Sequence, residues 1–379
     1  MTMQTKAAIL FESPGKWQTV TVDLDEPGPG EVLIQLAASG LCHSDDHYTT
    51  GDLTPAVLPL CGGHEGSGVV RAVGAGVTDL AEGDHVVSTF IASCGRCLWC
   101  ARGMQHLCDN GQHIGRGCMP DGTYRMHHDG RDVATTASSG TFAEWQVMSE
   151  NSVVKVPKDL PLDVVSLLAC GVPTGWGSAV HAAQVAPGDV VVVMGCGGIG
   201  INAVQGASHA GASHVVAVDP VDLKREVALR VGATDAFSTM AEATEFVRSV
   251  TNGQGAAAAI VTTGVLTGGH IGEAFSAVRK AGTVVVTSLG SDRAIPVNLV
   301  ELSMYQKRIQ GCLYGNASPR EQIPVLVELY RIGALKLDEL ITRRYPLEQV
   351  NEGYADLRAG LNIRGIVDFG LARAEGSDR

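Results

Sequence analysis

The sequence has few charged residues, few aromatic residues and no long apolar run. Charged residues make up 18% and aromatic residues 5% of its 379 residues, whereas 45% are hydrophobic. That hydrophobic share suffices for full cores and excludes an intrinsically disordered chain. No stretch reaches the roughly 18 consecutive apolar residues that a membrane helix needs. We therefore expect no membrane span and no membrane partner.

An excess of positive charge is also missing. The net charge is −12, from 28 Lys and Arg against 40 Asp and Glu. Nucleic-acid-binding proteins present a basic surface to phosphates, so we expect no nucleic-acid partner. The first residues, MTMQTKAAIL, lack the charged-then-apolar pattern of a secretion signal. These features predict a cytoplasmic protein, in which regularly spaced cysteines indicate metal sites before disulfides.

The pattern of apolar and turn-forming residues changes near residue 170. Before that point, short Val-rich runs at 31–38, 66–73 and 84–90 are separated by Gly- and Pro-containing turns, which predicts a mostly β domain. After it, apolar strand patterns alternate with helical patterns, which is typical of a doubly wound parallel α/β sheet. The strands are expected at 189–194, 214–219, 257–263 and 282–288, and the helices at 198–211, 224–233, 241–250 and 269–280.

A glycine-rich loop joins the first of these strands to the first helix. It reads GCGGIG, which fits the pattern G-x-G-x-x-G in the strand–turn–helix context that dinucleotide binding requires. Gly195 permits the tight turn, Gly197 lets the backbone approach a pyrophosphate, and Gly200 allows close helix packing. Gly198 and Ile199 complete the loop, and the helix N-terminus offers N–H groups to phosphates. A simple packing turn would use the same glycines.

An aspartate at the end of the second strand bears on which dinucleotide binds. Asp219 can accept hydrogen bonds from the ribose hydroxyls of NAD, and its charge would repel the extra phosphate of NADP. The alternative is an aspartate that caps the turn before Pro220. The sequence therefore predicts NAD(H) as the cofactor.

Four closely spaced cysteines form a first candidate metal site. Their spacing is C-x2-C-x2-C-x7-C, which allows four thiolates to surround one zinc ion and leaves no open position. An iron–sulfur cluster is an alternative, although its usual spacing differs, and disulfides or a zinc ribbon for nucleic acid are others. We expect a structural zinc in the lobe 94–108, held by Cys94, Cys97, Cys100 and Cys108.

Three further residues suit a second, open metal site. Cys42, His64 and Cys170 would offer zinc two thiolates and one imidazole. Taken singly, each is better explained as a buried hydrophobe or a core histidine. Their surroundings, CHSDDH, GGHEG and CGVPTG, resemble the zinc-containing medium-chain alcohol dehydrogenases. The resemblance runs along the whole chain, and it implies that these three residues hold a catalytic zinc.

The same resemblance implies roles for residues around that zinc. Asp45 corresponds to the carboxylate that orients His64, and Glu65 to an acidic residue behind the metal. Ser44 corresponds to the hydroxyl that bonds the substrate oxygen. His47 corresponds to the histidine at the solvent end of the proton relay, with an ordinary surface histidine as the alternative.

Four residues are expected to contact the cofactor on the same ground. Thr174 would flank the nicotinamide, and Arg364 would contact the pyrophosphate. His43 stands where many relatives carry an arginine, so its contact would depend on pH. Lys224 would lie near the adenosine ribose, and an exposed helix lysine is an equally good interpretation.

The resemblance also implies a domain division and an assembly. A GroES-like, mostly β catalytic domain would comprise residues 1–171 and 315–379, and a Rossmann NAD-binding domain residues 172–314. Relatives pair through the edge of the cofactor sheet, so we expect a homodimer or homotetramer, with 304–315 as the candidate pairing segment.

The local sequence is most similar to that of the actinobacterial nitrosoaniline-dependent alcohol dehydrogenases, in which NAD is oxidised and reduced without dissociating from the enzyme. The resemblance thus implies interconversion of alcohols and aldehydes with NAD(H) and two zinc ions per chain. A glutathione- or mycothiol-linked formaldehyde dehydrogenase is one alternative, for which Arg116 and Arg125 are candidate cationic groups. A non-enzymatic NAD-binding protein is the other.

Overall fold

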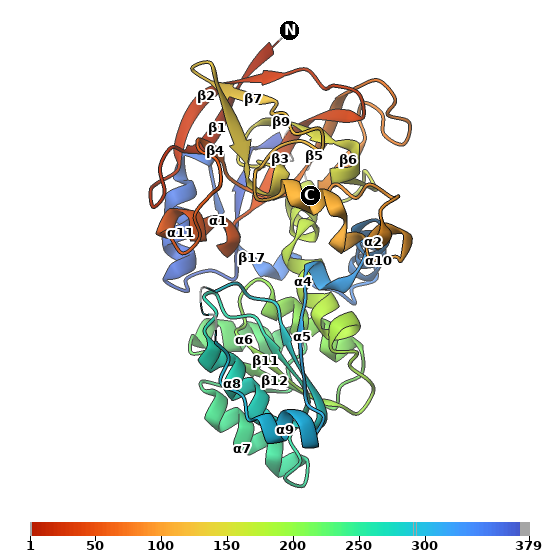
Figure 1. Cartoon of the computed structure of the whole chain (residues 1–379), viewed down its shortest axis with the longest axis vertical. Coiled ribbons are helices and arrows are strands. Elements are labelled where there is room, and N and C mark those ends of the chain that lie inside the picture. Colours follow the sequence, from red (N-terminus) through yellow and green to blue (C-terminus); the bar gives the residue numbers. More distant parts are fainter. Residues whose placement is uncertain (1, 291, 293, 372–379) are drawn as a thin grey trace. The chain divides into compact units, whose positions relative to one another are not determined.

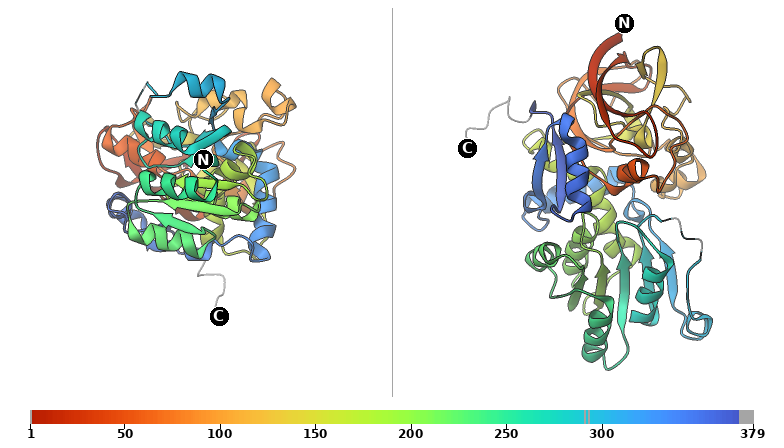
Figure 2. Two further views of the ribbon diagram at one scale, coloured as in Figure 1. Left: turned by 90° about the horizontal axis from the view of Figure 1, so that it is seen from below. Right: turned by 90° about the vertical axis from the view of Figure 1, so that its left-hand side faces the viewer.

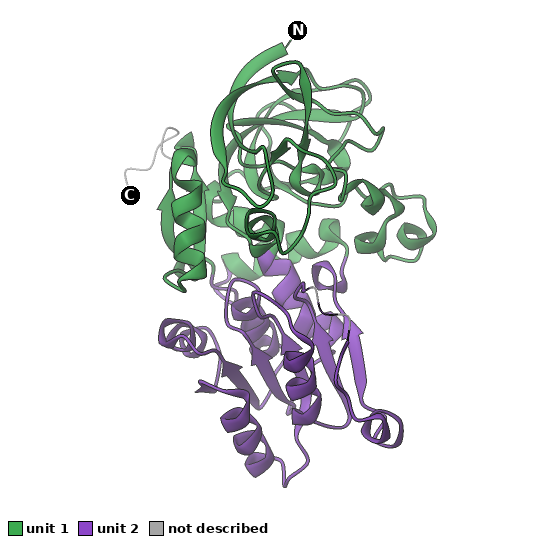
Figure 3. Ribbon diagram, turned by 60° about the vertical axis from the view of Figure 1, so that its left-hand side comes forward, with its two compact units in different colours: residues 1–170, 318–331, 337–379 green, residues 171–317, 332–336 purple. Residues whose placement is uncertain are grey.

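The computed structural model describes residues 2–290, 292 and 294–371 (Figure 1). The chain forms two compact units (Figure 3): unit 1 comprises residues 1–170, 318–331 and 337–379, and unit 2 comprises residues 171–317 and 332–336. The expected roles of the two domains stay predictions. They are catalysis for residues 1–171 and 315–379, and NAD binding for residues 172–314.

Unit 1 is built on a closed barrel and a mixed sheet. The barrel runs in the order β1 (Thr2–Leu10), β2 (Gln18–Asp25), β7 (Met126–His128), β8 (Arg131–Thr135) and β4 (Leu60–Cys61). The sheet runs in the order β10 (Val153–Val156), β6 (His85–Ser88), β5 (Glu65–Val73), β3 (Glu31–Gly40), β18 (Arg364–Asp368) and β17 (Ile341–Tyr345), with β9 (Trp145–Ser149) beside β3.

The strands expected at 31–38 and 66–73 are confirmed, and the third, expected at 84–90, is shorter. Alternate side chains of β3 explain its central place, because Val32, Ile34 and Leu36 are buried in one core cluster with residues of β5 and β6. The helices of this unit are α1 (His43–Thr50), α2 (Leu98–Ala101), α3 (Leu162–Val165), α10 (Pro319–Arg331) and α11 (Val350–Arg358).

Unit 2 is the expected doubly wound sheet. Its order is β13 (Asp235–Phe237), β12 (His214–Val218), β11 (Val190–Met194), β14 (Ala256–Val261), β15 (Val278–Val286) and β16 (Arg308–Gly311). All neighbouring pairs are parallel, and the order is that of a Rossmann fold. Every residue of β11 is buried, which explains its uninterrupted apolar run.

Helices lie on both faces of this sheet (Figure 2). They are α4 (Gly171–Gly177), α5 (Gly200–His209), α6 (Asp222–Arg230), α7 (Met240–Val250), α8 (Gly268–Ala277) and α9 (Leu299–Met304). Three of them end earlier than expected. The helix predicted to reach 211 ends at His209, and the one predicted to stop at Gly232 ends at Arg230, before Gly232 at φ +128°. The helix predicted to reach 280 ends at Ala277, because Val278 begins β15.

Across the residues with described positions, we find no helix long and apolar enough to cross a membrane.

Candidate functional site

The four-cysteine lobe brings its sulfur atoms together as the spacing predicted. The four sulfurs lie within 4.8 Å of one another. Backbone N–H groups point at them: that of Cys94 lies 3.2 Å from Sγ of Cys108, and that of Cys97 lies 3.3 Å from Sγ of Cys94. The backbone N–H groups of Cys100 and Asp109 lower the pKa of Cys97 to about 6. Such donors stabilise thiolates, so the lobe can hold a tetrahedral zinc with no open position.

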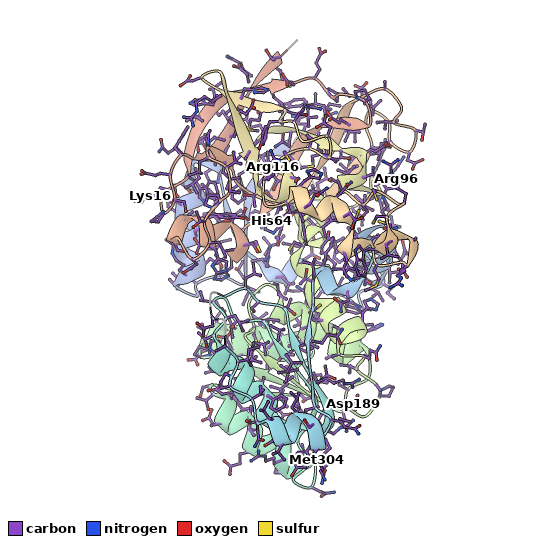
Figure 4. The ribbon with its side chains drawn as sticks, viewed as in Figure 1. Lys16, His64, Arg96, Arg116, Asp189 and Met304 are labelled. Carbon is purple, nitrogen blue, oxygen red and sulfur yellow. The ribbon has the colours of Figure 1, made fainter. Side chains whose placement is uncertain are left out.

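A second ligand group lies entirely within unit 1. Cys42, His64, Glu65 and Cys170 are buried, and one ligand atom from each lies within 4.8 Å of the others. Cys42 is the N-cap of α1, His64 immediately precedes β5 (it is labelled in Figure 4), and Cys170 immediately precedes α4. Three chain segments that are far apart in sequence thus converge on one point.

A buried carboxylate orients the histidine of this group. Oδ2 of Asp45 lies 2.9 Å from Nδ1 of His64, and Oδ1 of Asp45 accepts the N–H of Gly63 at 2.8 Å. Nδ1 therefore faces this carboxylate, which leaves Nε2 as the nitrogen that can bind a metal. The Phe90 ring stands edge-on to the imidazole, with centroids 6.0 Å apart.

The charges of this group suit a cation. Burial alone would lower the pKa of His64, but the Asp45 carboxylate and the Cys42 thiol outweigh burial and raise that pKa to about 10. The pKa of Cys42 lies well below its ordinary value, because hydrogen bonding to Cys170 and the charge of His64 outweigh burial. A thiolate and a carboxylate beside the imidazole thus make a site that can accept a cation such as zinc.

Glu65 and Arg364 form a buried ion pair beside this group. A terminal guanidinium nitrogen of Arg364 donates to Oε2 of Glu65, and both side chains are almost completely buried. Oε1 of Glu65 and Nε of Arg364 have no hydrogen-bond partner among the described residues. A side chain at Gly40 would collide with both groups, so this position requires glycine. The sequence indicated each residue separately, but nothing in it indicated the pair.

The predicted relay residues lie on α1. Ser44 is half-buried, and its Oγ lies 3.6 Å from Sγ of Cys42. The His47 side chain is buried, so His47 is not an ordinary surface histidine. Its Nδ1 lies 3.2 Å from Oδ2 of Asp52, a residue that the sequence analysis did not single out. The rings of His43 and His47 have centroids 6.4 Å apart.

The glycine-rich loop of unit 2 has the geometry that the motif predicts. Gly195 has φ +90°, which favours glycine, and a side chain at Gly200 would collide with the carbonyl oxygen of Gly195. A side chain at Gly197 would meet no atom within 4 Å, so the backbone there is open to a ligand. The hydroxyl of Thr262 donates to the Gly195 carbonyl at 2.6 Å and fixes the turn.

Asp219 is joined to this loop. Its Oδ2 accepts the N–H of Cys196 at 2.8 Å, and its Oδ1 accepts the N–H of Val221 at 2.9 Å. The turn-capping alternative is therefore part of what Asp219 does, and its buried carboxylate also holds the glycine loop. Arg225, which the sequence analysis missed, donates to the Asp219 carbonyl at 2.6 Å.

The other predicted cofactor residues divide between the units. Thr174 and Lys224 belong to unit 2, whereas His43 and Arg364 belong to unit 1. Thr174 is buried, and its Oγ1 has no hydrogen-bond partner among the described residues. Lys224 is half-buried on α6. An unpartnered hydroxyl such as that of Thr174 is expected where a ligand supplies the partner.

Comparison with known proteins identifies the family. The family described as "Alcohol dehydrogenase GroES-like domain" matches residues 28–158, and that described as "Zinc-binding dehydrogenase" matches residues 198–331. The chain belongs to the zinc-containing alcohol dehydrogenases. It is 49% identical over 367 residues to the NDMA-dependent alcohol dehydrogenase of Amycolatopsis methanolica, which covers 96% of this chain and 99% of the relative.

Two further proteins support the assignment. Alcohol dehydrogenase B of Mycobacterium tuberculosis is 43% identical over 370 residues, covering 97% of this chain and 99% of the relative. The crystal structure of benzyl alcohol dehydrogenase from Acinetobacter calcoaceticus superposes with a TM-score of 0.88 at 29% identity, covering 97% and 99% of the two chains. This zinc-containing alcohol dehydrogenase is therefore an enzyme that uses zinc and a nicotinamide cofactor, and the non-enzymatic alternative is wrong.

Proposed function

We propose that this enzyme interconverts primary alcohols and aldehydes at a zinc ion held by Cys42, His64 and Cys170. The observation that carries the proposal is the convergence of these three buried ligands, with Asp45 against the far nitrogen of His64. Three protein ligands leave one position for substrate, as in other catalytic zinc sites. Zinc supplies a Lewis acid that favours loss of the alcohol proton, and NAD supplies the hydride acceptor.

The chain's own residues handle the proton and the charge. Ser44, next to the ligand Cys42, accepts the proton of the alcohol as it passes its own hydroxyl proton on toward His47, and His47 delivers a proton to solvent. Glu65 keeps one carboxylate oxygen free of partners and can approach the metal while ligands exchange, and Arg364 limits how far Glu65 moves. A second zinc, held by Cys94, Cys97, Cys100 and Cys108, stiffens the lobe.

The glycine-rich loop and Asp219 of unit 2 are the main groups proposed to hold NAD(H). The open backbone at Gly197 and the N–H groups that begin α5, together with Gly195, Gly198, Ile199 and Gly200, receive the pyrophosphate. Asp219 receives the adenosine ribose with its remaining lone pairs, beside Lys224. Thr174 offers its unpartnered hydroxyl to the nicotinamide end. Arg364 is buried and paired with Glu65, so its expected pyrophosphate contact is not part of this proposal, and that of His43 stays a prediction.

The NAD(H) is further proposed to remain bound between turnovers. The support is the 49% identity to a relative named NDMA-dependent, since such an enzyme reoxidises its cofactor in place with an external acceptor. The test is to purify the protein without added cofactor and measure its absorbance and bound nucleotide after denaturation. We expect close to one NAD(H) per chain and alcohol oxidation with a nitrosoaniline acceptor. A nucleotide-free protein that turns over only with added NAD would contradict this part of the proposal.

The structure weakens the alternative of a thiol-linked formaldehyde dehydrogenase, because Arg125, one of the two cationic groups suggested for binding the thiol, is already paired. Arg125 forms two hydrogen bonds with Glu31, at 2.8 and 2.7 Å, and a third with Asp121 at 3.0 Å. Its charge is already neutralised, so it is not available to a carboxylate of glutathione. Activity with formaldehyde that required added thiol would overturn this conclusion.

Assembly and location complete the proposal. We propose a homodimer or homotetramer that pairs beside β16, the edge strand of the unit 2 sheet. The support is a group of exposed apolar side chains on the neighbouring α9, namely Leu299, Val300 and Met304, the last labelled in Figure 4. A cytoplasmic location is proposed on the ground that none of the ten cysteines, all of them among the described residues, forms a disulfide. Sedimentation of the purified protein tests the assembly.

A further inference from the structure

Asp52, which has no proposed role in binding zinc or cofactor, lies against the proposed relay histidine, His47. Oδ2 of Asp52 is 3.2 Å from Nδ1 of His47. Only 6% of the His47 side chain is exposed, whereas 46% of the Asp52 side chain is exposed. The pair therefore leads from a buried ring to the solvent-exposed surface of unit 1.

The turn that ends α1 holds Asp52 in this position. Gly51 has φ +86°, a left-handed conformation that glycine adopts without strain. The N–H groups of Gly51 and Leu53 both lie 3.1 Å from the carbonyl oxygen of His47, so the chain folds back over that residue. The hydroxyl of Thr50 donates to Oδ2 of Asp52 at 2.8 Å. The side chain is thus fixed by its own backbone and by a neighbour.

This contact decides which nitrogen of His47 carries the proton. The Thr50 hydroxyl and His47 lower the pKa of Asp52, so the carboxylate is ionised near neutral pH. An ionised carboxylate only accepts hydrogen bonds, so Nδ1 of His47 carries the hydrogen and Nε2 keeps its lone pair. The titratable groups facing the ring are Asp52 and His43, whose ring centroid lies 6.4 Å away.

We propose that Asp52 is the outer member of the proton relay, a positioning residue that acts through His47. The inference rests on the proposed role of His47. In alcohol oxidation, Nε2 accepts the proton released by the alcohol, and the imidazolium gives its Nδ1 proton to water through the Asp52 carboxylate. Loss of the Nε2 proton to water and return of a proton from water to Nδ1 then restore the starting tautomer, and aldehyde reduction runs the same transfers in reverse. The negative charge of Asp52 also stabilises the imidazolium between these transfers.

The inference is tested on the purified holoenzyme with Asp52→Asn and Asp52→Glu. The asparagine variant keeps the size of the side chain and removes its charge. We expect its maximal rate of alcohol oxidation to fall about 10- to 100-fold, within the range of general acid–base effects. The pH profile of its rate should change, because the carboxylate that receives the proton from His47 is gone. Asp52→Glu should recover most of the rate. Asp79→Asn, on an exposed loop, makes the same charge change and should alter neither quantity.

A second readout does not depend on activity. Nitrogen NMR of the holoenzyme labelled at histidine reports which ring nitrogen is protonated, and His47→Gln identifies the signal of His47. We expect the Nδ1–H form in the wild type and a mixture in Asp52→Asn. An Asp52→Asn variant with unchanged pH profile and unchanged tautomer would overturn the inference alone. If His47→Gln also left the rate unchanged, the proposed relay role of His47 would be wrong as well.

Discussion

Arg364 lies against Glu65, 299 residues away in the sequence, and the two form a buried ion pair beside the proposed catalytic zinc. Burial lowers the pKa of Arg364, and the nearby Cys42 thiol acts in the opposite direction. A buried pair of this kind is costly to break, because the remaining partner is left with an uncompensated charge. The pair therefore fixes the Glu65 carboxylate, and it ties β18 to the start of β5.

Loss of either partner should destabilise the fold strongly. Glu65→Ala or Arg364→Ala should each lower the free energy of unfolding by about 3–5 kcal/mol. Glu65→Leu/Arg364→Leu should cost less than the sum of the single changes, because neither charge is left alone. Urea unfolding of the zinc-loaded proteins measures the free energy of unfolding of each variant. Glu348→Ala is the matched control, since its pair with Lys6 is more than half exposed and contributes at most about 1 kcal/mol. Strictly additive single changes would contradict the coupling.

Mutations should distinguish the functions of the two proposed zinc sites. Cys100→Ser should lower the zinc content from two ions to one and reduce thermal stability, because the lobe loses a ligand of a closed site. Cys170→Ser should also leave one zinc but abolish alcohol oxidation while largely preserving the fold. Metal analysis, thermal unfolding and activity are compared on the same preparations. Full activity in Cys170→Ser would exclude the proposed catalytic site.

Asp219 should affect both cofactor choice and loop order. Asp219→Asn turns one accepting oxygen into a donor, which would face the N–H of Cys196 or of Val221. We expect NAD affinity to fall about 10- to 100-fold, which corresponds to hydrogen bonds from a charged acceptor at about 1.5–3 kcal/mol. Affinity for NADP should change much less, because the repulsion of its phosphate is relieved. Nucleotide titration of the stripped protein gives both constants. An equal loss for both nucleotides would show that only the loop was disturbed.

An ion pair in unit 1 should make stability depend on pH. Burial alone would raise the pKa of Asp84, but Lys155 at 2.7 Å and the N–H of Ala81 outweigh it and lower that pKa. The stability from this pair is therefore fully present above the unfolded pKa of about 3.9 and is lost as the pH falls through the lower folded value. Asp84→Asn should destabilise the protein by about 1–3 kcal/mol at pH 7.

That difference should shrink as the pH falls toward 3, because the wild-type carboxyl also becomes neutral there. Denaturant midpoints measured between pH 7 and the lowest pH at which the protein stays folded give the comparison. Asp79→Asn, which changes an exposed aspartate, controls for the change in net charge. A difference that stayed constant over this range would show that the charge of Asp84 does not matter.

Local sequence determined the features whose parts are close together in the chain. The doubly wound sheet follows from strand and helix patterns, and the loop from Gly195 to Gly200 follows from its own spacing, because turns and helix starts are set by neighbouring residues. The sulfurs of the four-cysteine lobe converge for the same reason. The set of Cys42, His64 and Cys170 needed a family resemblance as well, since each residue alone is ambiguous.

Only the tertiary structure decided the partners of these residues. Glu65 and Arg364 meet because β18 and β5 both pair with β3, a register that no local pattern encodes. Asp52 meets His47 because Gly51 turns the chain back after α1, and nothing in the sequence showed that the histidine would be buried while the carboxylate reached solvent. Ligand types can be recognised from short motifs, whereas the charge and tautomer of each ligand depend on contacts that form only when distant segments pack.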